Sequence, residues 1–167
     1  IIMKIRISQL VNDSIVDGTG IRLAVFTQGC IHNCPGCHNP ATHDVNGGIE
    51  SDTDKIISIM KENPLLDGVT LTGGDPFVQP KQCGLIAAAA HKIGLNVWTY
   101  TGYTFEEIQE INDPDFNNLL ENTDILVDGR FIESQRSLEL KFRGSRNQRI
   151  IDMNKTRETG VLTTIYN

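Results

Sequence analysis

Short apolar runs alternate along the chain with longer segments whose hydrophobic residues recur at helical spacing. The runs at residues 21–26, 68–72, 95–100, 125–128 and 149–152 have the length and composition of buried strands. Helical spacing is found between them, most clearly at residues 51–63 and 81–93. Alternation of this kind is typical of repeated strand–helix units and predicts a parallel sheet.

Local signals mark the ends of the predicted helices. Residues 51–54 and 104–107 both resemble capping boxes, which open helices. In the helix at residues 81–93, Gly94 is placed as the residue that follows the C-terminus. The inward face of this helix is expected to consist of Leu85, Ile86, Ala89 and Ile93.

Chain length and the number of strand–helix units limit the possible folds. The chain is long enough for one domain with a core and too short for two, so we expect a single domain at residues 1–167. About four or five strand–helix units are too few for a closed eight-stranded barrel. We therefore expect an α/β fold with an open, curved, mostly parallel sheet and helices on its outer face. Ligands bind beyond the carboxyl ends of strands in such sheets. The residues that come shortly after four of the predicted strands are Cys30, Gly73, Thr101 and Gly129.

Composition and charge argue against two classes of protein. The formal net charge of −6 argues against binding of nucleic acid through phosphate neutralisation, which needs many lysines and arginines. No apolar run approaches the roughly 20 residues that span a membrane, and the N-terminus does not resemble a signal peptide, so we expect a cytoplasmic protein. Residues 136–149 carry five of the fifteen basic residues, which suits a carboxylate-bearing ligand or an acidic partner, although a solvated loop has the same composition.

Three of the four cysteines lie close together on a loop that follows the first predicted strand. Cys30, Cys34 and Cys37 have a spacing that lets their thiolates converge on one metal centre. A structural zinc site usually has four ligands, whereas an iron–sulfur cluster bound through three cysteines keeps one iron open. From spacing alone, the alternatives are zinc with His32 or His38 as a further ligand, or three unrelated thiols.

The remaining cysteine and two of the histidines have no partner visible in the sequence. Cys83 stands alone on a predicted helix and is expected to be a small buried residue. His43 and His91 receive no functional role.

The cysteine spacing resembles the C-x-x-x-C-x-x-C signature of the radical S-adenosylmethionine superfamily. Upstream, residues 16–30 resemble the D-G-P-G-x-R…F-x-Q-G-C run of glycyl-radical activating enzymes, and downstream, residues 37–39 match their C-H-N. There are two departures. Thr19 replaces the usual proline, and Gly36 stands where many members carry an aromatic residue. The resulting C-P-G-C-H-N form is typical of the activators of ribonucleotide reductases.

This resemblance implies an open partial barrel of the radical S-adenosylmethionine type, with a [4Fe-4S] cluster bound by Cys30, Cys34 and Cys37. It also implies that residues 71–76 are a G-G-D-P variant of the G-G-E-P motif that contacts S-adenosylmethionine. Glycine lets the backbone approach a ligand closely, and carbonyl oxygens together with Asp75 are expected to receive the ammonium group of the methionine moiety. The cofactor contacts expected at these two motifs are Gly36, His38, Thr72, Gly73, Gly74 and Asp75.

Two segments nearer the C-terminus carry further expected contacts. Asp128 is expected to accept from ribose hydroxyls and Arg130 to pair with the cofactor's carboxylate, although a strand-end Asp-Gly is commonly only a turn. Residues 144–152 resemble the G-S-x-N-Q-R-x-I-D run of anaerobic ribonucleotide reductase activators, and a polar loop that enters a strand has a similar composition. Within that run, the candidates for contact with the cofactor or with a partner are Ser145, Asn147 and Arg149.

The resemblance also implies an activity and its partners. The expected oxidoreductase cleaves S-adenosylmethionine reductively and generates a glycyl radical on the large subunit of anaerobic ribonucleotide reductase. An external donor such as a flavodoxin is expected to supply the electron, and no general acid or base is needed. Alternatives are an activator of another glycyl-radical enzyme, of the pyruvate formate-lyase type, or a small radical enzyme acting on a nucleoside-like molecule. The alternative from another class is a non-catalytic zinc or iron–sulfur binding module.

Overall fold

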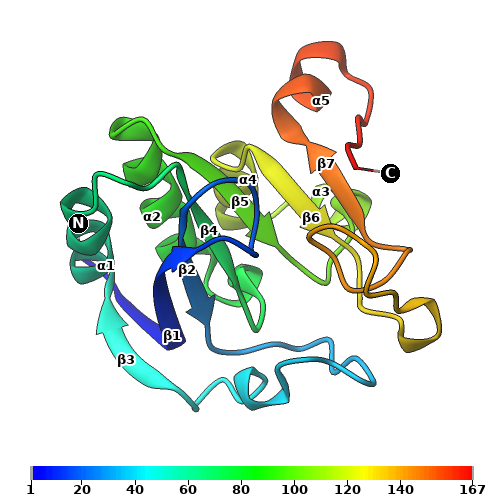
Figure 1. The fold of residues 1–167 in the computed structure, drawn as a ribbon, viewed down its shortest axis with the longest axis horizontal. Coiled ribbons are helices and arrows are strands. Elements are labelled where there is room, and N and C mark those ends of the chain that lie inside the picture. Colours follow the sequence, from blue (N-terminus) through cyan, green and yellow to red (C-terminus); the bar gives the residue numbers. More distant parts are fainter. Residues whose placement is uncertain (1, 167) are drawn as a thin grey trace.

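A single seven-stranded sheet organises the computed structural model, which describes residues 2–166 (Figure 1). The strands are β1 (Lys4–Ser14), β2 (Arg22–Thr27), β3 (Ile49–Asp52), β4 (Gly68–Gly73), β5 (Asn96–Tyr100), β6 (Ile125–Asp128) and β7 (Arg149–Asp152). The helices are α1 (Thr53–Glu62), α2 (Pro80–Lys92), α3 (Phe105–Ile111), α4 (Pro114–Glu121) and α5 (Met153–Thr159). None of the described helices has both the length and the apolar character that crossing a membrane requires.

The sheet is mixed, with the order β3-β1-β2-β4-β5-β6-β7. The expected parallel arrangement is confirmed for its four central strands, β2, β4, β5 and β6. The two edges differ, because β1 pairs antiparallel with both β2 and β3, and β7 pairs antiparallel with β6. β1 and β3 were not expected from the sequence. The strand at residues 21–26 is therefore the second in the chain, and the sheet is parallel only in its centre.

Side-chain caps fix where several helices begin. The capping box of α3 is confirmed, since Thr104 Oγ1 accepts from Glu107 N and Glu107 Oε1 accepts from Thr104 N. The capping box predicted at residues 51–54 was misplaced by one residue. The N-cap of α1 is Asp52, whose side chain accepts from Lys55 N at 2.7 Å. The C-terminal end of α2 also agrees with the sequence, because Gly94 follows the helix with a φ of +82°.

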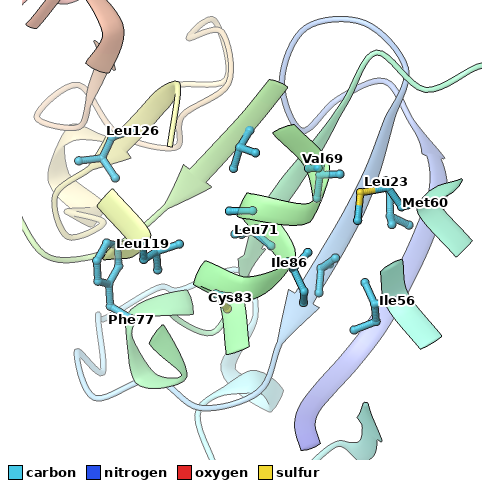
Figure 2. Close-up of a cluster of buried hydrophobic side chains, with 14 of the residues drawn as sticks. Leu23, Ile56, Met60, Val69, Leu71, Phe77, Cys83, Ile86, Leu119 and Leu126 are labelled. Carbon is cyan, nitrogen blue, oxygen red and sulfur yellow. The ribbon is translucent and has the colours of Figure 1, made fainter. Parts of the chain in front are cut away.

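Helices α1, α2 and α4 cover one face of the sheet and enclose the main hydrophobic core. Figure 2 shows Ile56 and Met60 of α1 and Ile86 of α2 pointing toward Leu23 and Leu71 of the sheet. The residues of α2 that are fully buried are Cys83, Gly84, Ile86, Ala87 and Ala90.

The expected inward face of α2 is therefore correct at Ile86 and wrong at Ile93. Leu85 and Ala89 are half-buried, and Ile93 lies past the end of the helix with 40% of its surface exposed. Apart from Ile86, the buried residues of α2 are small. The burial of Cys83 is confirmed, and burial raises the pKa of its thiol.

The opposite face of the sheet carries a smaller cluster and a buried charge. Trp98, Val127 and Ile150 form the cluster, and the Arg22 guanidinium lies over the Trp98 ring at 5.6 Å. The Arg22 guanidinium donates to Thr70 Oγ1 and to the carbonyl oxygens of Thr19, Val69 and Asn96. Burial lowers the pKa of Arg22 to about 10, so the group remains charged at neutral pH.

Paired substitutions in α2 test this arrangement of the core. Ile86→Ala is expected to reduce the free energy of unfolding by about 2–5 kcal/mol, because it leaves a cavity among fully buried side chains. Ile93→Ala is expected to change it by less than about 0.5 kcal/mol. Urea denaturation of the reduced, metal-free protein measures both. A larger loss for Ile93→Ala would support the helix face expected from the sequence.

Candidate functional site

A cavity of about 400 Å³ lies where the parallel strands end, a volume in the range of small-molecule sites. It is bordered by the residues that follow β2, β4, β5 and β6, as the rule for open parallel sheets predicts. The segment between β2 and β3 and the loop between β6 and β7 approach this edge of the sheet from two sides (Figure 1).

About half of the residues expected from the sequence meet at this cavity. Those that line it are Cys30, Cys34, Cys37, His38, Thr72, Gly73 and Gly74. Those that lie outside its wall are Gly36, Asp75, Asp128, Arg130, Ser145, Asn147 and Arg149. The three cysteines and the strand-end glycines are thus brought together, whereas the expected charged contacts are not.

The loop that carries Cys30, Cys34 and Cys37 (the cysteine loop) is held at its start by backbone hydrogen bonds to the segment that follows it and to the end of β4. Gly29 N donates to Thr42 O at 2.6 Å, and Cys30 N donates to His43 O at 3.2 Å. Asp75 N donates to Gly29 O at 2.7 Å, which joins the loop to the end of β4. These bonds hold the start of the loop at the cavity while the chain continues to Cys34 and Cys37.

The thiols differ in their surroundings. His43 Nε2 lies 3.4 Å from Cys37 Sγ, a contact that the sequence did not suggest. Asn39 N donates to the same sulfur at 3.5 Å. Burial raises the pKa of the Cys30 thiol.

The glycines of the G-G-D-P motif meet backbone rather than open space. A Cβ atom on Gly73 would collide with the backbone of Thr27, and one on Gly74 would collide with the carbonyl group of Gly29. Gly73 also has a φ of +100°, which favours glycine. The motif therefore lets the end of β4 pack directly on the start of the cysteine loop.

The two histidines offered as zinc ligands have other neighbours. His32 Nε2 lies 2.6 Å from Asp75 Oδ2, and the His38 ring lies 5.3 Å from that of Phe131, centroid to centroid. Within residues 2–166, no three His, Cys, Asp or Glu side chains surround a common point as ligands of one metal ion do. Thiolates of a [4Fe-4S] cluster bind different irons and need no such point.

The charged residues at the end of β6 and the start of β7 form ion pairs with one another and with two glutamates of α3. Arg130 donates to both oxygens of Glu107, at 2.9 and 3.1 Å. This bidentate pair lowers the pKa of Glu107 to about 2. Arg149 donates to Asp128 and to Glu106, which raises the pKa of the guanidinium. Arg130, which the sequence offered to the carboxylate of the cofactor, and Arg149 therefore already have carboxylate partners.

The other polar residues of the resemblance near the C-terminus hold the loop between β6 and β7 in shape. Ser145 is fully buried and its hydroxyl accepts from Ile132 N at 3.2 Å. Asn147 Nδ2 donates to Arg130 O at 2.7 Å, and Asn147 Oδ1 is buried without a hydrogen-bond partner among the described residues. Both residues brace the segment that forms one wall of the cavity.

Arg143 lines the cavity and was not among the contacts expected from the sequence, although it lies in the basic segment at residues 136–149. It is the only lysine or arginine among the described residues that line the cavity, and it has no ion pair within residues 2–166. Its guanidinium donates to the carbonyl oxygens of Gln148 at 2.7 Å and Tyr166 at 3.2 Å. Its Nε is buried and has no hydrogen-bond partner in the part of the chain that the structure describes. Tyr100 also lines the cavity, and burial raises the pKa of its hydroxyl.

Comparison with known proteins adds to this geometry. Residues 16–151 match the domain family described as a 4Fe-4S single cluster domain. The chain is 34% identical over 143 residues to the anaerobic ribonucleoside-triphosphate reductase-activating protein of Vibrio cholerae, covering 80% of this chain and 89% of the relative. The chain belongs to the anaerobic ribonucleoside-triphosphate reductase-activating protein family. Members from Escherichia coli K12 (33% identity, 80% of this chain and 90% of the relative) and phage T4 (31% identity, 81% and 86%) are similar along the same length.

A solved structure resembles this member of the activating-protein family in fold. The crystal structure of QueE from Escherichia coli superposes with a TM-score of 0.50 and 15% sequence identity. The superposition covers 60% of this chain and 54% of QueE, about half of that protein.

The donor atoms of this family member suit the cluster that the domain family is named for. Three thiol sulfurs line one cavity, and thiolate is the usual protein ligand of iron–sulfur clusters. The cavity extends past them to the strand-end backbone and Arg143, which leaves room for a second ligand beside the cysteines.

Replacement of each cysteine by alanine tests this assignment. Cys30→Ala, Cys34→Ala and Cys37→Ala are each expected to abolish cluster binding, because the three thiols share the cavity. Cys83→Ala is the matched control and is expected to retain about four irons per chain, since Cys83 lies in the core. Iron and acid-labile sulfide after anaerobic reconstitution are the measurements. Equal loss of iron in all four variants would contradict the three-cysteine site.

Proposed function

We propose that this protein activates anaerobic ribonucleoside-triphosphate reductase by generating a glycyl radical on it. The observation that carries the proposal is the meeting of Cys30, Cys34 and Cys37 with the end of β4 and an unpaired arginine in one cavity. The names of relatives that match most of the chain specify the reductase as the partner of those proteins.

The cofactors of the proposed reaction are a [4Fe-4S] cluster held by the three cysteines and S-adenosylmethionine beside it. When bound, the cluster supplies the electron that cleaves the sulfonium of S-adenosylmethionine, and this cleavage provides the oxidant that removes a hydrogen atom from glycine. The chain itself binds and orients these groups and limits access of water to them. We propose that the backbone at Thr72 and Gly73 and the side chain of Tyr100 border the second ligand, because they line the same cavity as the cysteines.

We further propose that the whole chain works as one domain, an open partial barrel of the radical S-adenosylmethionine type. The four central parallel strands, the helices on one face of the sheet and the likeness to QueE support this fold. An external one-electron donor such as a flavodoxin completes the proposed reaction.

Arg143 is the group we propose for the carboxylate of S-adenosylmethionine. Arg130 and Arg149 already pair with acids. Arg143 lines the cavity and, within residues 2–166, donates to neutral carbonyl oxygens alone. A guanidinium without a counter-ion in a half-buried site favours an anionic ligand.

The glycyl radical itself is the direct test of the function. Reconstituted protein, S-adenosylmethionine and a chemical reductant are mixed with the anaerobic reductase of the same host, and the glycyl radical is sought by electron paramagnetic resonance. We expect the radical with the unmodified protein and none with Cys34→Ala. S-adenosylmethionine cleavage without a radical on the reductase would indicate a different substrate, as the alternatives of another glycyl-radical enzyme or a nucleoside-like molecule require.

Substitution of arginines tests the carboxylate contact. Arg143→Met is expected to weaken S-adenosylmethionine binding about tenfold or more, since a charge-assisted hydrogen bond is lost. Arg146→Met, an exposed neighbour outside the cavity, is the control and is expected to leave affinity unchanged. Equilibrium dialysis with the reconstituted proteins gives both values. A greater loss for Arg130→Met than for Arg143→Met would favour the contact expected from the sequence.

A further inference from the structure

Asp75 is the most completely engaged carboxylate near the cavity. The residue is fully buried, and its Oδ1 accepts from Phe77 N at 2.9 Å. Its Oδ2 accepts from Gly102 N at 2.9 Å and lies 2.6 Å from His32 Nε2. The Thr101 hydroxyl lies within 3.0 Å of both oxygens.

These four donors leave Asp75 little capacity for a further ligand. An ionised carboxylate has about four lone-pair sites, and four donors surround this one. Asp75 is also absent from the cavity wall. An ammonium group would have to displace an existing donor to reach it, which disfavours the ammonium contact expected from the sequence.

The partner of Asp75 within the cysteine loop is His32, which lies midway between Cys30 and Cys34. Its side chain is only 3% exposed. A Cβ atom on Gly102 would collide with the imidazole ring, so the absence of a side chain there makes room for it. The Tyr103 ring meets the imidazole edge to face, with centroids 4.7 Å apart. His32 is thus fixed by contacts on several sides.

We infer that His32 and Asp75 are positioning residues that hold the Cys30–Cys34 half of the cysteine loop against the ends of β4 and β5. The inference rests on the proposed function, because it assigns these residues to the placement of the cluster beside the second ligand. Through Asp75, one carboxylate joins the loop that carries the cysteines to Thr101 and Gly102, which line the cavity.

The hydrogen bond between His32 and Asp75, rather than the volume of the imidazole ring, joins the cysteine loop to the strand ends. The carboxylate is an acceptor, so the imidazole Nε2 donates to it. A buried bond between a donor and a carboxylate is among the stronger hydrogen bonds in proteins. Without it, the loop retains its backbone bonds near residues 29 and 30. Within residues 2–166, however, it loses the one side-chain hydrogen bond that joins its Cys30–Cys34 part to the strand ends.

A pair of substitutions that differ in the donor tests the inference. His32→Gln keeps a nitrogen at the reach of Nε2, whereas His32→Met has similar length and no donor. His91→Met is the control, because His91 forms a similar pair with Asp124 at 2.8 Å, away from the cavity. The chelator concentration that removes half of the iron from the reconstituted protein is measured for each.

For His32→Met we expect that about 10- to 100-fold less chelator removes the iron, and for His32→Gln and His91→Met a value near that of the unmodified protein. Hydrogen exchange of the Cys37 amide, which donates to Cys34 O, is expected to speed up about tenfold in the metal-free protein in His32→Met alone. His32→Asn, whose amide is too short to reach Asp75, provides the same comparison if His32→Met does not fold.

Different failures of this experiment have different meanings. Iron retention and amide exchange in His32→Met equal to those of the unmodified protein would overturn the inference, as would equal damage in His32→Gln. Absence of a cluster from the unmodified protein would overturn the proposed function instead. The exchange measurement uses metal-free protein, so in that case it would still decide whether His32 anchors the loop.

Discussion

The close packing of the end of β4 on the end of β2 determines where the site lies. Gly74 lies so near the Gly29 carbonyl that no side chain fits between them, and Asp75 N donates to that carbonyl. The cysteine loop therefore leaves β2 in contact with the end of β4, and its thiols lie at the ends of the parallel strands. A bulkier residue at position 74 would push the loop away from the strands whose ends complete the cavity.

The sequence predicted the centre of the fold better than its edges. Central strands are buried on both faces and appear as continuous apolar runs, as at residues 23–26. β3 has only one apolar residue, Ile49, and forms because β1 pairs with it. The inward face of α2 was misjudged because large residues were assumed to be buried. Contact with α4 instead requires small residues, and Asn118 lies directly against Gly84.

Within the site, spacing in the sequence identified those residues that lie together in one short segment of the chain. The three cysteines and the glycines of residues 73–74 each lie within one short segment. The pairing of charges depends on distances between separate segments, so no local pattern indicates that Arg130 meets Glu107 or that His32 meets Asp75. Arg143 is distinguished by its place in the cavity wall and by having no acidic partner within residues 2–166, two properties that require the folded structure.

The antiparallel strand β7 limits how far this architecture can be extended. A further strand–helix unit added beyond β6 would have to pair in parallel with it, but β7 already occupies that edge. The series of parallel strands thus ends at four, and the opposite end is blocked in the same way by β1. Enlargement of the fold by duplication of its repeating unit would first require the loss of an edge strand. New segments are therefore more easily accommodated in the two long loops beside the cavity than in the sheet.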